Sequence, residues 1–511
     1  MYLLGIDVGT SGTKTVLFDL CGNTIADAVY EYPLYQPQIG WAEQRPEDWW
    51  NATIETIKEM LIKSGIKPDE IKGIGLSGQM HGLVLLDKNG EVLRPSIIWC
   101  DQRTQQECDI ITEEIGRDNL INITANPALT GFTASKLMWV KRHQRDIFDK
   151  ISKVLLPKDY IRYKLTGQFA TEVSDASGTQ LLDVPKRKWS VEIISKLGFD
   201  KDWMPECFES QQVSGHISAE ASRITGLHEG TPVVGGGGDQ AAGAVGNGIV
   251  KTGVISSTIG TSGVVFGFMD KVKIDPKGRV HTFCHAVPDK WHVMGVTQGA
   301  GLSLQWLRNN FGGCERELAR FLGVDPYELM AQEAEQANPG CNGLMYLPYL
   351  MGERTPHLDP YAKGVLFGMT AKHTRNDVIR AFMEGVAYSL KDCFEIIKDM
   401  DIEVNEVRAS GGGGKSALWR QMQADMFDTG IHTINSTEGP ALGAALLAGV
   451  GAGVYSDVSQ ACDCAIKTVS IQSPIRKNVD IYDKYYNIYG KLYLALKESF
   501  LDISRLNIEN L

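Results

Sequence analysis

Two features that the sequence lacks already exclude whole classes of function. No hydrophobic run is long enough to cross a membrane, because even a long uncharged stretch such as residues 439–455 falls short of the ~20 apolar residues that a bilayer span requires. Glycine and alanine fill much of that stretch, which favours a tightly packed buried helix. Lysine and arginine form no cluster, and their 51 residues are outnumbered by 62 acidic ones, giving a net charge of -11. We therefore expect neither a nucleic acid nor a membrane as partner.

Cysteine is present but shows no pattern of metal or disulfide use. The ten cysteines are scattered, and the only close pair, Cys462 and Cys464, is separated by one residue rather than by a usual zinc-ligand spacing. Reduced thiols in a cytosolic protein are the simplest interpretation. The chain also starts directly with a strand-like run, without a basic leader or a small-residue cleavage site, so we expect a cytoplasmic protein.

Length and hydrophobic periodicity predict a mixed α/β protein with two domains. A chain of 511 residues exceeds what one simple core can hold. Apolar runs around glycine turns predict strands at 3–6 and 15–18, and further strands are expected at 71–77 and 82–87. Helical spacing is found over residues 46–66, 379–399 and 479–506, the last of which is expected to be a long helix on the second domain.

One short internal repeat suggests that the two domains share a plan. Gly9-Thr10-Ser11-Gly12 recurs as Gly260-Thr261-Ser262-Gly263, each time between apolar, strand-like runs. Between the copies, a run of four glycines at 235–238 leads into Asp239 and a small-residue segment. We place the junction there and predict domains at residues 1–245 and 246–511.

The first copy of the repeat has the composition of a phosphate-binding turn. The segment 7–14 combines backbone N–H groups freed by glycine turns, the hydroxyls of Thr10 and Ser11, and the carboxylate of Asp7, which could hold hydrated Mg²⁺. A single glycine-rich hairpin of this kind is often only a turn. The second copy at Gly260 favours a pair of turns that bind phosphate.

A series of motifs resembles the FGGY carbohydrate kinase family, within the actin-like and hexokinase-like ATPase superfamily. The motifs cover nearly the whole chain, with the last fifty or so residues the least diagnostic. They are DVGTSGTK at 7–14, GQMHG at 78–82, WCDQR at 99–103, GFTASKLMWV at 131–140, GGGGDQAAGAVG at 235–246, GERTP at 352–356, GVLFG at 364–368, SGGGGKS at 410–416 and GPALGAA at 439–445. The resemblance implies two ribonuclease H-like α/β domains with a central cleft.

The resemblance also implies roles for individual residues in phosphoryl transfer from ATP. Asp239, which by itself would be read as a helix N-cap, becomes the general base for the sugar's terminal hydroxyl, kept charged by the helix end. Asp7 is expected to organise Mg²⁺ through water. The residues expected around the β- and γ-phosphates are Thr10, Ser11, Lys14, Gly260 and Thr261.

The remaining site residues are divided between sugar and adenosine. Met80 and His81, with Gln240 beside the base, are expected to contact the sugar, and the Met-His pair resembles the branch of the family that acts on D-xylulose rather than on glycerol. Asp101 and Arg103 are open between a sugar contact and a structural ion pair. The adenosine site is expected to consist of Gly301, Gln305, Gly412, Gly413, Gly414 and Ser416.

Two features do not follow the simplest pattern. Residues 409–416 read A-x-x-x-x-G-K-S, a relaxed P-loop motif, but this segment lies late in the chain and the duplicated turns explain phosphate binding better. Phe382 stands where the family usually has a smaller or unbranched residue, so the packing beside Glu384 is expected to differ.

The expected activity is phosphorylation of D-xylulose to D-xylulose 5-phosphate with ATP and Mg²⁺. Another sugar or aldonate, such as L-ribulose or gluconate, is the alternative within the family, because residues outside the motifs decide specificity. A binding protein that has lost catalysis is the alternative from another class. The expected partners are the small-molecule sugar and ATP, with a homodimer left open.

Overall fold

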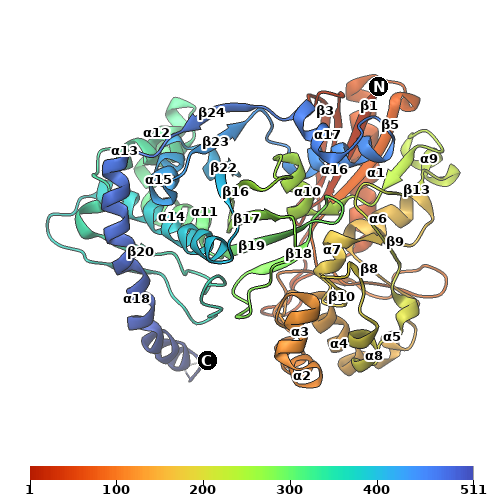
Figure 1. Ribbon diagram of the computed structural model, residues 1–511, viewed down its shortest axis with the longest axis horizontal. Helices are drawn as coiled ribbons and strands as arrows, with labels where there is room; N and C mark the ends of the chain where they lie inside the picture. Colours follow the sequence, from red (N-terminus) through yellow and green to blue (C-terminus); the bar gives the residue numbers. More distant parts are fainter. Residues whose placement is uncertain (510–511) are drawn as a thin grey trace.

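The structure is a computed structural model that describes the backbone of residues 1–509 and the side chains of residues 1–506. Two seven-stranded mixed sheets form the centres of its two halves (Figure 1). The first sheet has the order β13 (Val213–His216), β14 (Pro232–Val234), β5 (Ile71–Gly78), β1 (Tyr2–Val8), β2 (Gly12–Phe18) and β3 (Thr24–Glu31), and β15 (Gly237–Gly238) also pairs with β5.

The second sheet repeats this plan. Its order is β18 (His281–Cys284), β19 (Trp291–Thr297), β17 (Gly263–Met269), β16 (Gly253–Ile259), β22 (Val404–Ser410), β23 (Ile431–Ile434) and β24 (Thr468–Gln472). In both sheets the strand before the repeated turn is antiparallel to the strand after it and parallel to its other neighbour. The predicted α/β fold with two halves of one design is confirmed.

The predicted helices are present, with shifted ends. Helix α1 (Pro46–Ser64) begins with proline at its first position and ends at Gly65 in the left-handed region (φ 63°), as helix-end chemistry favours. Helix α14 (Arg375–Asp399) crosses the core of the second half, and α18 (Arg476–Glu509) lies along that half, as expected. The strand expected at 82–87 is β6 (Val84–Leu86).

Helices α10 (Asp239–Gly246) and α16 (Gly439–Gly451) cross at the junction of the two halves. A Cβ on Gly443 would lie 1.8 Å from the Ala242 carbonyl oxygen, so glycine permits this close approach. Although α16 comes late in the chain, it packs on β1 and β5 of the first sheet, together with α17 (Val458–Ala465) (Figure 1). The uncharged segment is thus a buried helix, as predicted. Within residues 1–509, no helix has the length and apolar character of a membrane span.

The first half also contains a helical region that carries part of the site. Its elements are α2 (Gln105–Ile115), α3 (Arg117–Thr124), α4 (Thr133–His143), α6 (Pro157–Thr166), β9 (Ala170–Glu172), α7 (Val173–Ser177) and β10 (Leu182–Asp183). The edge strand β18 of the second sheet reaches this region, because Asn126 donates from its side-chain amide to the Thr282 carbonyl at 3.0 Å. Cys284 N–H donates to the Ser177 hydroxyl at 3.0 Å.

Short helices lie around the second sheet, and several of them line a cavity. They are α11 (Ala300–Phe311), α12 (Gly313–Leu322), α13 (Pro326–Glu335) and α15 (Ala417–Phe427), with the strand pair β20 (Met345–Leu347) and β21 (Val365–Phe367) beside α14. Phe382 on α14 stacks on Tyr346 with ring centroids 3.8 Å apart. Glu384, on the same helix, instead binds Arg380 and Tyr482, so the large ring and the buried carboxylate pack on different neighbours.

Candidate active site

Two carboxylates stand at the same edge of the first sheet. Asp7 is the second-last residue of β1, and the register places it beside Ser77 of β5, which in turn pairs with Gly237 of β15. All three strands are parallel and end at this edge, and Asp239 follows β15 directly. Strand spacing separates β1 from β15 by about 10 Å. The fold thus brings together two acids that are 232 residues apart in sequence, from Asp7 to Asp239.

The two carboxylates differ from ordinary surface acids. Burial raises the pKa of Asp7 to about 6, and its Oδ1 atom is buried without a hydrogen-bond partner among the described residues. Burial, followed by the charge of Asp7, raises the pKa of Asp239 to about 7, and the Gln240 N–H donates to Asp239 Oδ1 at 2.8 Å. The sequence had suggested that the helix end keeps Asp239 charged. The side chain is half-buried, and its loss of hydration outweighs that effect on the pKa.

The first turn, between β1 and β2, is held from outside through its carbonyl groups. Tyr32 donates its hydroxyl to the Gly9 carbonyl at 2.5 Å, and the Gln44 amide donates to the Thr10 carbonyl at 2.7 Å. The Trp99 indole donates to the Thr10 hydroxyl at 2.9 Å. The backbone N–H groups of Thr10 and Ser11 donate to nothing within the described chain. Free amides at a glycine turn are suited to phosphate oxygens.

Lys14, expected at the phosphates, has a protein partner in this structure. Its ammonium lies 2.5 Å from a Glu438 carboxylate oxygen, just before α16. Both side chains are partly exposed, so the pair is accessible to a competing anion.

The second turn, between β16 and β17, has the same sequence but is one residue tighter. Gly260 N–H donates to the Ser262 carbonyl at 2.9 Å, whereas Gly9 N–H in the first turn donates to the Gly12 carbonyl at 3.0 Å. The start of α11 holds this turn, because Gly301 N–H donates to the Gly260 carbonyl at 2.8 Å. The N–H groups of Thr261 and Ser262 likewise have no acceptor in the described part of the chain.

A cavity of about 670 Å³ opens beside the second turn. Most of the residues that the sequence assigned to the nucleotide on this side line it, namely Gly260, Thr261, Gly301, Gln305, Gly412, Gly413 and Ser416. Gly414 is buried just behind them and is not part of the lining. Tyr327 and Gln332 of α13 and Met383 of α14 also line the cavity. The motifs gave no signal for these three residues.

The residues expected to contact the sugar lie where the two halves meet. Met80 is buried against Gly238, where an added Cβ would lie 2.9 Å from Met80 Cγ. His81 has a left-handed backbone (φ 69°), and its ring lies 4.7 Å from that of Phe132. Phe283 of β18 lies 6.2 Å from the same ring. One half therefore supplies the histidine and the other completes its surroundings.

The protonation state of His81 follows from its partner. Its Nδ1 atom lies 2.8 Å from the Gly178 carbonyl, which can only accept, so Nδ1 carries the proton. Burial lowers the pKa of His81 to about 3, with the charges of Lys136 and Arg354 acting in the same direction. The ring is therefore neutral, and its Nε2 atom is an acceptor available to a sugar hydroxyl.

Arg354 is a cation in the GERTP motif at 352–356, and the motif alone predicted no role for it. Its charge lowers the pKa of both His81 and His281, after burial, and it therefore lies near both rings. Its guanidinium forms no hydrogen bond or ion pair with the described residues, whereas the neighbouring Glu353 is held by Thr297 at 2.6 Å. A desolvated cation without a protein partner is a candidate ligand contact.

Asp101 and Arg103 are partners of each other. The Arg103 guanidinium donates to Asp101 at 2.7 Å, lies 2.8 Å from Glu43 and stacks on Trp41 at 3.6 Å. Both side chains are almost completely buried. The geometry therefore favours a structural ion pair over a sugar contact for Asp101 and Arg103.

Both halves of the chain match known proteins. Residues 2–246 match the N-terminal domain of the FGGY family of carbohydrate kinases, and residues 255–452 match its C-terminal domain. The chain is 41% identical over 497 residues to a xylulose kinase of Bacillus subtilis, covering 97% of both chains. It is 33% identical over 505 residues to a gluconokinase of the same organism, covering 98% of both. A solved, ligand-bound xylulose kinase from Lactobacillus acidophilus is 28% identical, with a TM-score of 0.90 over 98% of this chain and 99% of that one.

Proposed function

The chain belongs to the FGGY family of carbohydrate kinases, and from this premise we propose that it transfers the terminal phosphoryl group of ATP to D-xylulose, giving D-xylulose 5-phosphate. The similarity to xylulose kinases over nearly the full length is the observation that carries the proposal. The Met80-His81 pair supports it from the side of the site, because Met80 packs against Gly238, the residue before Asp239.

The proposed chemistry divides between three groups of this chain. Asp239 takes the proton of the sugar's terminal hydroxyl, and its pKa of about 7 places it close to the range in which a general base is most effective. His81 accepts a hydrogen bond from another sugar hydroxyl and thereby orients the substrate. The free amides of the two repeated turns bind phosphate oxygens from both sides, which aligns the transferred group and disperses its charge.

The donor set of the site fits a hydrated Mg²⁺ ion. Asp7 offers a buried oxygen without a protein partner, and among the described residues no three acidic, histidine or cysteine groups converge on one point. An ion held there by one carboxylate would keep most of its water, which Mg²⁺ tolerates well. When bound, it would neutralise charge on the phosphates. We include ATP and Mg²⁺ in the proposal on these grounds.

The substrate is tested by a panel of sugars with ATP and Mg²⁺. We expect kcat/KM to be highest for D-xylulose among D-xylulose, L-ribulose, gluconate and glycerol. An Asp239→Ala variant should lose about 10²- to 10⁴-fold in kcat and still bind the sugar in calorimetry. A variant with full activity would remove Asp239 as the base, whereas a different best sugar would correct the substrate and keep the mechanism.

Gluconate is the second candidate because one specific feature favours it. The Arg354 guanidinium has no hydrogen-bond or ion-pair partner among the described residues, its charge lowers the pKa of His81, and it is suited to a carboxylate; a gluconokinase is also among the relatives. An Arg354→Leu variant separates the two substrates. It should raise the KM for gluconate about tenfold more than the KM for D-xylulose if the carboxylate is bound there.

The remaining parts of the proposal concern the setting of the enzyme. A cytoplasmic location is supported by ten cysteines that are all unpaired. A division into domains at residues 1–245 and 246–511 is supported by the two sheets, although α16 packs on the first of them. A homodimer is supported by exposed apolar side chains such as Phe311 and Phe321, and light scattering would measure it. A coupled ADP-release assay distinguishes the kinase from a binding protein without activity.

A further inference from the structure

The short helix α7 contacts three functional points at once. The Ser174 hydroxyl accepts from the backbone N–H of Gly238 at 3.2 Å, immediately before Asp239. The carbonyl of Gly178, the residue after the helix, accepts from His81. The Ser177 hydroxyl accepts from Cys284 of the second half. Whatever fixes α7 therefore also fixes the base, the sugar-binding histidine and a contact between the halves.

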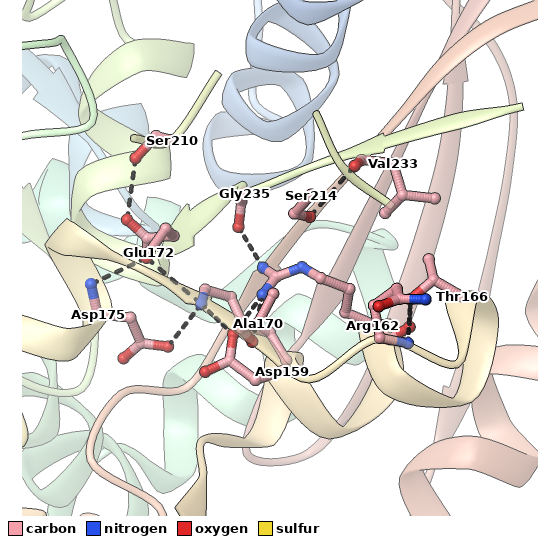
Figure 2. A network of polar contacts seen from close by, with 12 residues as sticks. Asp159, Arg162, Thr166, Ala170, Glu172, Asp175, Ser210, Ser214, Val233 and Gly235 are labelled. Carbon is pink, nitrogen blue, oxygen red and sulfur yellow. Dashed lines mark hydrogen bonds and ion pairs between the residues drawn. The ribbon is translucent and has the colours of Figure 1, made fainter. Parts of the chain in front are cut away.

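A buried cluster of charges fixes the start of α7 (Figure 2). Lys158 contacts Asp159 at 2.8 Å, Asp175 at 3.2 Å and Glu172 at 3.3 Å, and all four side chains are completely buried. Arg162 joins the same cluster through Asp159 at 2.9 Å. Removing so many charges from water is costly, and buried ion pairs rarely add net stability. A role in fixing geometry explains the cluster better than a role in stability.

Glu172 connects the charge cluster to the first turn of α7 through hydrogen bonds. One of its carboxylate oxygens accepts from Ser174 N–H at 2.7 Å and from the Ser210 hydroxyl at 2.9 Å. The other accepts from Asp175 N–H at 2.9 Å and from the Ser174 hydroxyl at 3.0 Å. A hydroxyl has one proton, so Ser174 donates it to Glu172 and turns a lone pair toward Gly238. The carboxylate therefore sets the direction of the Ser174 contact.

The glycine run that leads to Asp239 has little freedom of its own. Arg162 donates to the Gly235 carbonyl, as Figure 2 shows. Gly236 has a positive φ of 69°, and an added Cβ would lie 1.9 Å from the Leu76 carbonyl oxygen. Gly237 and Gly238 pair with β5. The Ser174 contact is the last support before the base.

We propose that Ser174 is a positioning residue for phosphoryl transfer, which holds the Gly238 amide and thereby directs the Asp239 carboxylate at the sugar hydroxyl. The proposal rests on the role of Asp239 in the proposed function. A general base must lie within hydrogen-bond reach of the proton that it takes, so a small displacement lowers the rate of transfer more than it weakens binding.

The test compares Ser174→Ala with Ser210→Ala. Both serines are buried and both donate to Glu172, but only the Ser174 hydroxyl contacts Gly238. We expect Ser174→Ala to lower kcat about tenfold, with the KM values for ATP and sugar within about twofold of the original protein. Ser210→Ala should keep kcat within about twofold and lose a similar amount of thermal stability. Each variant is assayed as the full chain with the sugar that the original protein phosphorylates best.

Amide hydrogen exchange gives a second readout that needs no activity. The Gly238 amide should exchange faster in Ser174→Ala than in Ser210→Ala or the original protein. Equal kcat values for the two variants, or an unchanged exchange rate at Gly238, would overturn the proposal. If the original protein phosphorylates no sugar of the panel, the proposed function fails, and the exchange rates still decide whether Ser174 holds Gly238.

Discussion

The two repeated turns share the sequence Gly-Thr-Ser-Gly, but the strand residues that flank them differ in charge. Aligning the repeats places Asp7 opposite Thr258 and Lys14 opposite Val265, so both charges belong to the first turn. The free amides at the tips are common to both turns. Duplication therefore supplies two turns with free amides that can bind phosphate, while the groups that can hold a cation or change charge lie on one side only.

The polar residues at the equivalent position also differ in how they are satisfied. The Thr258 hydroxyl lies 2.6 Å from the Ser410 hydroxyl, so its hydrogen bonding is completed within the protein. Asp7 Oδ1 is buried and has no hydrogen-bond partner among the described residues. Since unsatisfied buried polar atoms are costly, the first position is prepared for a ligand and the second is structural.

The largest expected effect comes from neutralising the charged turn. Asp7→Asn keeps the shape of the side chain and removes its charge, so kcat should fall by about 10²- to 10³-fold in steady-state assays with Mg²⁺. The matched change in the other turn, Thr258→Val, should cost about 1 kcal/mol of stability through its lost hydrogen bond and keep kcat within about threefold. Equal losses of kcat in the two variants would contradict the asymmetry.

The next effect concerns the free energy of unfolding, which the charged carboxylate of Asp239 lowers. Folding raises the pKa of Asp239 from 3.8 to about 7, so the folded state prefers the neutral carboxyl group. The stability that this group contributes is therefore complete below pH 4 and is lost as the pH rises through 7. Asp239→Asn should therefore raise the free energy of unfolding at pH 8 by a few kcal/mol while abolishing activity.

The gain in the free energy of unfolding should become smaller as the pH falls from 8 to 5. At pH 5 Asp239 of the original protein is uncharged in the folded state, as the asparagine of the variant is at every pH. Urea titrations at a series of pH values measure it. A gain that does not depend on pH would show that the carboxylate is not responsible.

An effect of intermediate size is expected where α10 and α16 cross, and it can be tested from either helix. An added Cβ would lie 1.8 Å from a backbone oxygen of the other helix at both Gly246 and Gly443. Alanine at either position should cost about 1–3 kcal/mol, with a lower Tm in thermal unfolding. Gly490→Ala is the control, because this exposed position on α18 has nothing within 4 Å and should gain about 0.5–1 kcal/mol. A gain of stability in Gly443→Ala would contradict the close approach of α10 and α16 at this position.

The smallest effect concerns Lys14 and its partner. Glu438→Gln should release the ammonium for phosphate and lower the KM for ATP about two- to threefold, because the pair is partly exposed and worth little. Lys14→Met should raise the KM about tenfold. Both effects should shrink at high salt. A higher KM in Glu438→Gln would indicate that Glu438 itself supports nucleotide binding.

Sequence patterns predicted the parts of this site that depend on local backbone chemistry. The turns at Gly9 and Gly260 and the helix that begins at Asp239 were each visible in a few neighbouring residues. Tyr327 and Gln332 were not, because they reach the cavity beside the second turn from an ordinary helix whose position depends on packing. The long α1, α14 and α18 were predictable from periodicity, and only their ends shifted.

Two decisions belong to the tertiary structure alone. The sequence left Asp101 and Arg103 open between sugar and ion pair, and only their burial beside Glu43 and Trp41 favours the latter. It also suggested that the helix end keeps Asp239 charged, whereas loss of hydration in the folded protein raises its pKa.

The sequence by itself determined the duplicated α/β plan, the two glycine turns and the residue types that phosphoryl transfer needs, because these depend on short-range backbone and side-chain chemistry. The three-dimensional arrangement decided that α16 crosses back to the first sheet, that β18 completes the surroundings of His81, and that α7 connects Ser174 to the strand before Asp239. These are contacts between residues far apart in the chain, and burial, hydration and charge take their values only when such residues meet.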